Sequence, residues 1–454
     1  MGNPDPNEVP LARRLGLFDA TMIVMGGIIG AGIFVNPAVV ARNVHTPLLV
    51  LGAWLIGGMI ALIGAFVYAE LAALRPRVGG QYAYLRDAYH PIVAFLYGWT
   101  LLLVVQTGGM AGAAIIFGRY FCELFGFSIS EQVVATVALA ILTAVNCLGV
   151  RAGSNVQSAL MLIKLLAIAL LIGVGCFGPV KTISAGVELP VDSGGFSGLT
   201  RAMAPVLFAY GGWQTASFLS GEMRNPRRDL PRGLLIGVIG VIVCYVLVSY
   251  SCVRVLGVTD LARTNIPASA VMGHALGGRG AQVIAAGIAI STLGFLSQSI
   301  LTAPRVYYAM ARDGVFFKAV GYLDPRTHVP TVAIVLQGVC AAVIAFTGKY
   351  DQILNYVVAI DVLFFGLTGA SLLIFRARPE GESPEKEELR VPWHPITTSV
   401  FVLACWAIAI STVVQFPRNA GIGVGILAAG ALVYPLWRSG AQGASGPQNS
   451  PDVM

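Results

Sequence analysis

Charged residues are scarce in this chain. They make up only 11% of its 454 residues, whereas a soluble domain carries about 25%. Apolar residues reach 56%, so a soluble protein of this composition could not cover its surface with polar groups. The composition excludes an ordinary soluble domain and predicts an all-α polytopic membrane protein.

The motifs of metal, redox and nucleotide sites are also missing. The seven cysteines form no CxxC pair and the five histidines show no HxxxH spacing. There is no GxxxxGK[ST] phosphate loop, and His, Asp and Glu do not gather as an active site would require. We expect no metal, no cofactor, no ATP drive and no enzyme activity.

The net charge of +7 has a simple explanation in a membrane protein. Basic residues collect in cytoplasmic loops beside anionic lipid. No basic segment interleaved with aromatic residues is long enough to form a nucleic-acid module. The expected partners are therefore the lipid bilayer and a small molecule, and no nucleic acid.

Twelve apolar runs are long enough to cross a bilayer, which takes about 20 helical residues. They lie at about residues 17–42, 47–74, 91–121, 129–148, 154–178, 200–221, 233–256, 280–311, 331–347, 352–375, 396–416 and 420–437. An even number of spans places both termini on one side of the membrane.

The Lys and Arg residues indicate which side that is. About two thirds of them lie in the N-terminal segment, the C-terminal tail and the loops on the same side, which predicts that this side is cytoplasmic. We expect a cytoplasmic segment at 1–14 without a cleaved signal peptide, a disordered cytoplasmic tail at 438–454, and a place in the cell membrane.

Two spans carry glycine pairs near their centres. The first contains GGIIGAGIF (26–34) and the sixth contains FAYGGWQ (208–214). Each stretch alone could serve helix packing through small residues. Interrupted helices in corresponding positions of two halves instead indicate an inverted repeat with a binding site at the bilayer midplane.

A broken helix offers two kinds of backbone group. Carbonyls at the end of its first half attract a cation, and amides at the start of its second half attract an anion. Two adjacent breaks could therefore bind the ammonium and carboxylate of a zwitterionic amino acid through backbone atoms alone.

Six sequence blocks, in order along most of the chain, resemble one known family. They are GGIIGAGIFVNP (26–37), VGGQYAYLRDAY (78–89), LTAVNCLGVRAGSNVQ (142–157), IKLLAIAL (163–170), FAYGGWQTASFLSGEMRNPRRDLPRG (208–233) and TAPRVYYAMARDG (302–314). The chain is similar to the amino acid–polyamine–organocation (APC) superfamily, and within it to the L-type amino acid transporter family.

The resemblance implies a LeuT-like fold of twelve transmembrane helices. Two five-helix inverted repeats would occupy 15–178 and 200–376, with discontinuous helices 1 and 6, and the last two helices would occupy 395–437. It also implies sodium-independent transport of L-amino acids, chiefly neutral ones, by alternating access and exchange. A proton-coupled symporter, or a membrane sensor or channel, remains an alternative.

The resemblance also implies a substrate site at the two breaks. The carboxylate would meet the amides of Ala31, Gly32 and Ile33, and the ammonium would meet the carbonyls of Ile28, Phe208 and Gly211. The remaining site positions implied are Gly30, Ala209, Gly212 and Trp213. The Phe208 ring would close over the substrate as a gate unless it faces lipid or core, and Trp213 would support the pocket or only pack.

Three further residues are candidates for coupling or selectivity. Lys164 lies inside the fifth span, where the resemblance implies contact with the broken first helix in place of a sodium ion; a purely structural tie is the alternative. Asp361 in the tenth span could favour polar or cationic substrates, pair with an arginine, or stay protonated. Cys252 stands where the family tends to carry a tyrosine.

Other polar positions receive simpler interpretations. Asp19, Glu70, Glu123 and Glu222 lie near predicted span ends and are interpreted as interfacial or cap residues. Cys122 abuts the apolar end of the third span and not an exposed loop. We therefore expect no heavy-chain glycoprotein subunit bonded through a cysteine.

Overall fold

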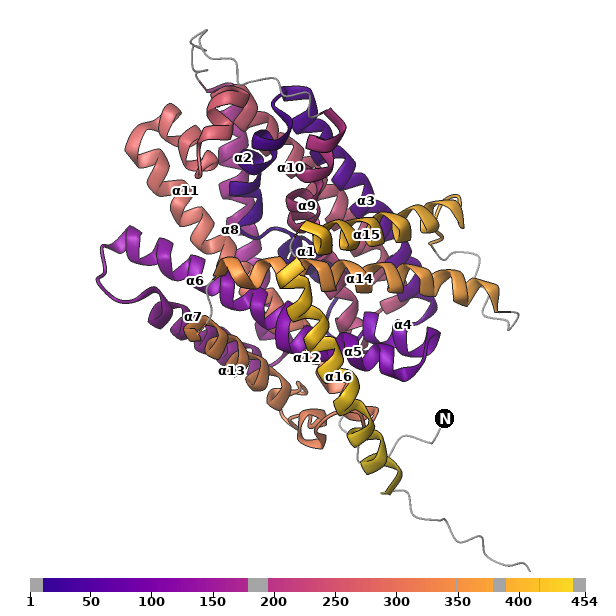
Figure 1. Cartoon of the computed structure of the whole chain (residues 1–454). Coiled ribbons are helices and arrows are strands. Elements are labelled where there is room, and N and C mark those ends of the chain that lie inside the picture. The colour runs from indigo at the N-terminus through magenta and orange to yellow at the C-terminus, as the bar shows by residue number, and fades with distance from the viewer. Residues whose placement is uncertain (1–10, 179–194, 348–349, 379–388, 416, 444–454) are drawn as a thin grey trace, which may run out of the picture.

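The computed structural model describes residues 11–178, 195–347, 350–378, 389–415 and 417–443. Within these ranges the chain is helical, and a single isolated bridge between Leu15 and Met223 is its only β interaction. Most of the predicted N-terminal segment, and the tail beyond 443, lie outside the described residues. Figure 1 shows the helices packed around α1 at the centre of the molecule.

The described chain forms helices connected mostly by short links. The α-helices are α1 (Leu17–Ile28), α2 (Gly32–Val44), α3 (Pro47–Leu74), α4 (Gln81–Ala88), α5 (Pro91–Thr100), α6 (Gln106–Phe125), α7 (Glu131–Cys147), α8 (Val150–Phe177), α9 (Gly195–Tyr210), α10 (Pro226–Arg263), α11 (Pro267–Thr302), α12 (Pro304–Arg312), α13 (Thr331–Thr347), α14 (Tyr350–Ala377), α15 (Ile396–Gln415) and α16 (Pro417–Gly443). Shorter elements are a π-helical turn η1 (Leu101–Val105) and the 3₁₀ helices η2 (Trp213–Glu222) and η3 (Lys318–Gly321).

The helices confirm the predicted polytopic membrane protein. Eight of them, some continued by a neighbouring element, are long and apolar enough to cross a bilayer in the described part of the chain. The pair α1 and α2 forms another span bent by 44°, and α7 and α13 are shorter apolar helices. With α9 and η2 as the sixth, each of the twelve predicted runs coincides with a helix or a broken helix. The last helix, α16, continues past the predicted boundary at 437.

Several helix starts follow directly from the sequence. Proline is the first residue of α3, α5, α10, α11 and α12, where its missing amide hydrogen and fixed φ are tolerated. The hydroxyl of Thr46 accepts from the Leu49 amide and that of Ser130 from the Val133 amide. At the other end, Gly126 closes α6 in the left-handed region with φ 65°.

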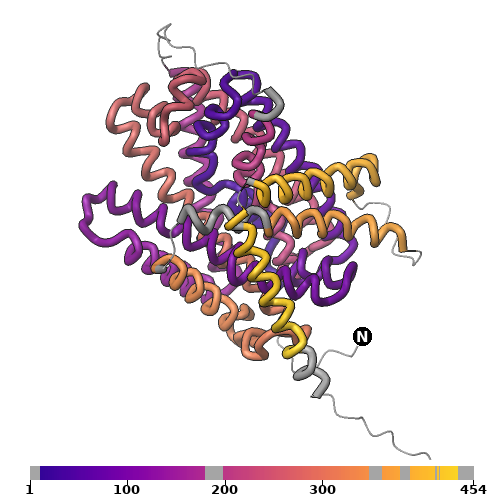
Figure 2. The backbone as a smooth tube through the Cα atoms, viewed as in Figure 1, coloured from indigo at the N-terminus to yellow at the C-terminus, as the bar shows by residue number. Residues whose placement is uncertain are grey.

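The two interrupted spans lie in the interior of the bundle. The helix α1 packs against α8, α10, α11 and η2, while α9 packs against α2 and α3. The C-terminal helices α14 and α15 lie side by side and flank this core, as the orange and yellow segments of Figures 1 and 2 show. The breaks in the two spans are therefore enclosed by neighbouring helices, as a break at membrane depth requires.

Two of the acidic residues near span ends are buried, which corrects their interpretation as interfacial residues. Glu222 is fully buried and forms a bidentate pair with Arg305 at 3.0 and 2.8 Å. Glu70 accepts two bonds of 2.7 Å from Arg376 and another from the Val391 amide. Arg305 lies in α12 and Arg376 in the last turn of α14, so the packing of helices brings to these carboxylates arginines that are far away in the sequence.

Asp19 is a helix cap, as predicted, and also an ion-pair partner. Its carboxylate accepts from the Gly16 amide at the start of α1, from Ser154 at 2.9 Å and from Arg151 at 3.1 Å. Glu123 is exposed near the end of α6, in agreement with an interfacial position. The Asp19 contacts tie the start of the first span to the start of α8.

The buried pair allows a direct test of stability. Removing one partner leaves an uncompensated buried charge, which costs about 3–5 kcal/mol, whereas an exposed pair contributes about 1 kcal/mol or less. We expect Arg305→Leu to lower the thermal unfolding temperature of the purified protein strongly. The control Arg119→Leu, which breaks the exposed pair with Glu131, should change it little. Equal unfolding temperatures for the two variants would contradict this assignment.

Candidate functional site: the two helix breaks

The first span is broken where the sequence places its glycines. The helix α1 ends at Ile28 and α2 begins at Gly32, so Ile29, Gly30 and Ala31 lie between two helical halves. Glycine within a helix is less favourable than alanine by about 1 kcal/mol. The GGIIGAGIF stretch is thus where the helix most readily stops, and the break predicted from it is confirmed.

The sixth span is broken at its glycine pair. The helix α9 ends at Tyr210, and a 3₁₀ helix begins at Trp213. Between them Gly212 has φ 104°, a conformation that residues with a Cβ rarely adopt. Both predicted discontinuous helices are therefore present.

The two breaks touch through glycine. A Cβ added to Gly27 would lie 2.6 Å from the Gly212 carbonyl oxygen, and one added to Gly212 would lie 2.2 Å from the Gly27 carbonyl oxygen. No other residue type allows this approach without moving a backbone. This contact explains why both motifs carry glycine, because a side chain at either position would separate the broken helices.

The carbonyls of the first break are bound by side chains from three neighbouring helices. Tyr245 of α10 donates to Ile28 at 3.0 Å, Lys164 of α8 donates to Ile29, and Ser291 of α11 donates to Gly30 at 3.0 Å. The Tyr245 hydroxyl also lies 3.2 Å from the Ala209 carbonyl in the sixth span. One tyrosine thus bridges the carbonyl ends of both broken helices.

The amides of the same break have no such partners. Among the described residues, the amides of Ala31, Gly32 and Ile33 donate to no other segment, whereas that of Phe34 bonds to the Ala31 carbonyl. They begin the helix α2, where the macrodipole also favours negative charge. This end of the break can bind an anionic group such as a carboxylate.

The two aromatic site candidates of the sixth span, Phe208 and Trp213, differ in exposure. Phe208, in the last turn of α9, is 38% exposed. Trp213 is buried, with its ring centroid 4.7 Å from that of Tyr68 and 5.7 Å from that of Phe365. Trp213 and Gly211 also line a cavity of about 40 Å³ between α3, α9, α14 and α15.

The α10 residue at the breaks is Tyr245 and not Cys252. Cys252 is buried two helical turns further on, which corresponds to about 10 Å along the axis. The sequence singled out Cys252 and not Tyr245, and the role of Cys252 stays a prediction. The signal that could have found Tyr245 is a hydroxyl in an apolar run, since such groups seek partners within the membrane.

Glutamines also hold the first broken helix and were missed. Gln157 of α8 donates to the Met22 carbonyl at 2.8 Å, and its amide occupies the space beside Gly26. Gln298 of α11 lies against Gly27 and donates to the Thr215 hydroxyl at 2.5 Å. Gly26 and Gly27 therefore make room for these side chains as well as for the neighbouring helix.

Asp361 lies in α14, and among the described residues no hydrogen bond joins it to the carbonyls and amides just described. One of its carboxylate oxygens is buried and has no hydrogen-bond partner among the described residues. The helix turn that follows it packs against the site, because Phe365 contacts Trp213. No cluster of three or more His, Cys, Asp or Glu residues able to hold a metal occurs in the described ranges.

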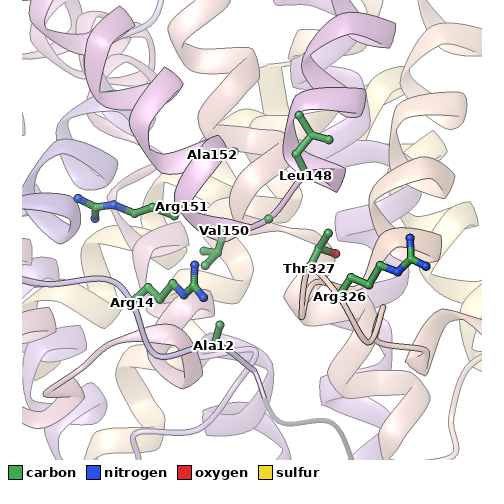
Figure 3. Close-up of a pocket in the computed structure, with 9 residues that line it drawn as sticks. Ala12, Arg14, Leu148, Val150, Arg151, Ala152, Arg326 and Thr327 are labelled. Atoms are coloured by element: carbon green, nitrogen blue, oxygen red, sulfur yellow. The ribbon is translucent and has the colours of Figure 1, made fainter.

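A larger cavity, of about 80 Å³, lies apart from the breaks. It is lined by Ala12, Arg14, Leu148, Gly149, Val150, Arg151, Ala152, Arg326 and Thr327. In Figure 3 Arg14 points toward Val150, while Arg151 and Arg326 extend in opposite directions. The arginine side chains do not converge on one point, so we do not consider this cavity a candidate binding site.

Two discontinuous spans that meet in the core of a helical membrane protein define the architecture of a secondary transporter. The chain belongs to the amino acid permease family, whose model matches residues 15–434. This membership confirms the resemblance to the APC superfamily and its L-type transporters, and with it the LeuT-like fold class.

Named relatives cover most of the chain. It is 32% identical to the human b(0,+)-type amino acid transporter 1 over 88% of this chain and 83% of that protein. It is 30% identical to the human large neutral amino acids transporter small subunit 2, over 94% of this chain and 81% of that protein. It is 28% identical to the serine/threonine exchanger SteT of Bacillus subtilis, over 93% of this chain and 96% of that protein. Amino acid transport across a membrane is therefore the general function of this chain.

The glycine contact between the breaks can be tested with a matched control. Gly212→Ala and Gly126→Ala both place a Cβ at positive φ, which costs roughly 1–2 kcal/mol. Only Gly212→Ala also drives that Cβ into the Gly27 carbonyl, because the space around Gly126 is open. We expect Gly212→Ala to abolish amino acid uptake into proteoliposomes and Gly126→Ala to retain it. Similar uptake by both variants would show that the close approach is not needed.

Proposed function

We propose that the chain is a sodium-independent secondary transporter of L-amino acids, chiefly neutral ones, working by alternating access and exchange. The observation that carries this proposal is the asymmetry of the first break. Side chains bind its carbonyls, while the amides of Ala31, Gly32 and Ile33 have no partner in another described segment. The similarity to a serine/threonine exchanger and to a large neutral amino acid transporter supports the same function.

The substrate would bind mostly through backbone atoms. Its carboxylate would accept from the three amides that begin α2. Its ammonium would donate to the carbonyls of Ile28, Phe208 and Gly211, since a carbonyl oxygen that already accepts one bond has a second lone pair. Gly30, Ala209 and Gly212 complete the two breaks around it. Backbone recognition suits a carrier whose substrates share the α-amino acid group.

The residues around the bound α-amino acid group would control access to the site and selectivity among amino acids. Phe208 would close over the substrate from outside, a role that its partial exposure in the last turn of α9 allows. Asp361 and Cys252 stay candidates for selectivity. Trp213, packed between Tyr68 and Phe365, would hold the sixth-span break against α3 and α14.

Lys164 would couple the first break to the scaffold in place of a metal ion. Its ammonium is fully buried in α8 and donates to the Ile29 carbonyl. A buried cation at a helix-end carbonyl supplies the charge that a bound sodium ion would supply elsewhere. Sodium independence follows if this ammonium occupies the place of the ion.

The working cycle would move the two broken helices against the remaining spans. We assign 15–178 and 200–376 to two inverted repeats and 395–437 to the last two helices, with both termini in the cytoplasm and the protein in the cell membrane. We also propose that it acts without a heavy-chain subunit. Cys122 donates to the Ile129 carbonyl at 3.3 Å, so its thiol is engaged within its own hairpin.

Counterflow in proteoliposomes tests this function. Purified protein, reconstituted without a partner, should take up labelled L-serine or L-leucine faster when the lumen holds the unlabelled amino acid, and sodium should not change the rate. Uptake that ignores internal substrate but follows a pH gradient would replace the exchanger by a proton-coupled symporter. Currents beyond carrier turnover would indicate a channel, and binding without uptake would indicate a sensor.

Lys164→Ala tests the coupling role. Losing a charged hydrogen bond at a buried carbonyl costs about 1.5–3 kcal/mol, or roughly a 10- to 100-fold change in an equilibrium constant. We therefore expect counterflow to slow by roughly that factor while the protein still folds, as judged by size-exclusion chromatography. Lys318→Ala, at an exposed lysine, is the matched control. Unchanged exchange kinetics in Lys164→Ala would show that the contact of Lys164 with the first break is structural and has no role in coupling.

A further inference from the structure

Gln298 of α11 is a buried polar residue that contacts both broken spans. Its side-chain nitrogen donates to the Thr215 hydroxyl of η2 at 2.5 Å, and only 1% of the residue is exposed. The same nitrogen lies 3.1 Å from the position that a Cβ on Gly27 of α1 would occupy. One side chain of α11 therefore touches the first half of the first span and the second half of the sixth.

Thr215 connects this bond to the sixth break. Its hydroxyl donates to the Gly212 carbonyl at 2.6 Å while it accepts from Gln298. A hydroxyl can do both at once, because it has one hydrogen and two lone pairs. The Gly212 carbonyl oxygen is also the atom that lies 2.6 Å from the position of a Cβ on Gly27. The chain of bonds that starts at Gln298 therefore ends at the contact between the two breaks.

The position of Gln298 along α11 places it on one side of the proposed substrate site. Ser291 of the same helix donates to the Gly30 carbonyl inside the first break. Two helical turns later, about 10 Å along the axis, Gln298 lies beside Gly27 in α1, whereas the amides proposed to bind the substrate begin α2. Gln298 therefore lies between the site and the membrane surface from which α1 starts, here called the α1 side, which the Lys and Arg residues predict to be cytoplasmic.

The broken spans are packed against the surrounding helices on the α1 side. Both α1 and η2 contact α11, α1 also contacts α8, and η2 also contacts α12. Opening this side of a carrier requires α1 and η2 to move away from some of these helices. The bond between Gln298 and Thr215 is neutral, so it breaks and re-forms at lower cost than the buried ion pair of Glu222 with Arg305 at the far end of η2. It is the contact of η2 that suits a repeated movement.

We propose that Gln298 is a positioning residue of the transport cycle. Through Thr215 it latches η2 to α11 while the α1 side is closed, and the latch opens when that side opens. The closed latch keeps Gly212 against Gly27, so it holds both breaks in the arrangement seen here. It therefore favours the empty carrier whose α1 side is closed. This proposal rests on the proposed transport of amino acids, and it adds a residue that sets the balance between the two states of the carrier.

Two substitutions remove the bond from either end, and two others are controls. Gln298→Met keeps the length of the side chain beside Gly27 but cannot donate, and Thr215→Val keeps the shape of threonine but loses the hydroxyl. The conservative variant Thr215→Ser keeps the hydroxyl. Gln337→Met removes another buried glutamine that donates to α11, at the Ser299 carbonyl (3.1 Å), but from α13.

The measurement compares the half-saturation constants for labelled L-serine or L-leucine, whichever supports counterflow, in right-side-out and inverted membrane vesicles. In a two-state carrier each constant rises as the state open to its side becomes rarer. We expect Gln298→Met and Thr215→Val to raise the ratio of the constant on the opposite side to that on the α1 side. The rise should be roughly two- to tenfold, the effect of one neutral hydrogen bond on an equilibrium. Thr215→Ser and Gln337→Met should keep the wild-type ratio.

The outcomes separate the two proposals. Absence of amino acid uptake by the wild type in both orientations would refute the proposed function, and the latch with it. Uptake that slows equally from both sides with an unchanged ratio would overturn the latch alone, because a purely structural role predicts that result. So would a double variant whose shift is the product of the single shifts, since two ends of one bond are not independent. If one variant does not fold, as judged by size-exclusion chromatography, the variant at the other end of the bond must show the shift.

Discussion

The structure depends on one constraint, which is that backbone polar groups inside a membrane must find partners. A broken helix violates this constraint at both sides of the break. At the first break, Tyr245, Lys164 and Ser291 satisfy the carbonyls from three different helices. The amides that begin α2 have no such partners in the described part of the chain, so they are free to bind an anionic group. The proposed binding of a substrate carboxylate would satisfy these amides.

The same reasoning applies to side-chain charge. Three interior carboxylates have arginine partners, and each pair joins segments far apart in the sequence, as Glu222 and Arg305 do. Such pairs fix the packing of helices because separating them would leave a charge unpaired. Asp361 differs from these three carboxylates, because one of its oxygens is buried and has no hydrogen bond among the described residues. The three paired carboxylates therefore contribute to the packing of the helices, and Asp361 does not do so through an ion pair.

The sequence predicted the spans and both breaks because each has a local cause. Apolar length determines a span, and glycine weakens a helix wherever it occurs. Partners across the fold have no local signature, so Glu222 was interpreted as interfacial although it is fully buried against Arg305. Tyr245 was missed for the same reason, since only the three-dimensional structure brings its hydroxyl to two carbonyls 181 residues apart in the chain. Single-residue chemistry can be read from sequence, whereas pairing depends on the fold.

The two breaks are also mechanically joined. Gly27 and Gly212 meet backbone to backbone, and the Tyr245 hydroxyl lies within hydrogen-bond distance of both carbonyl ends. One broken helix cannot tilt far without moving the other or losing these contacts. Lys164 of α8 and Ser291 of α11 donate to the carbonyls of the first break only. A substrate that bonds to both breaks would strengthen the first set of contacts and compete with the second, which is how binding at backbone atoms can bias a transporter between its states.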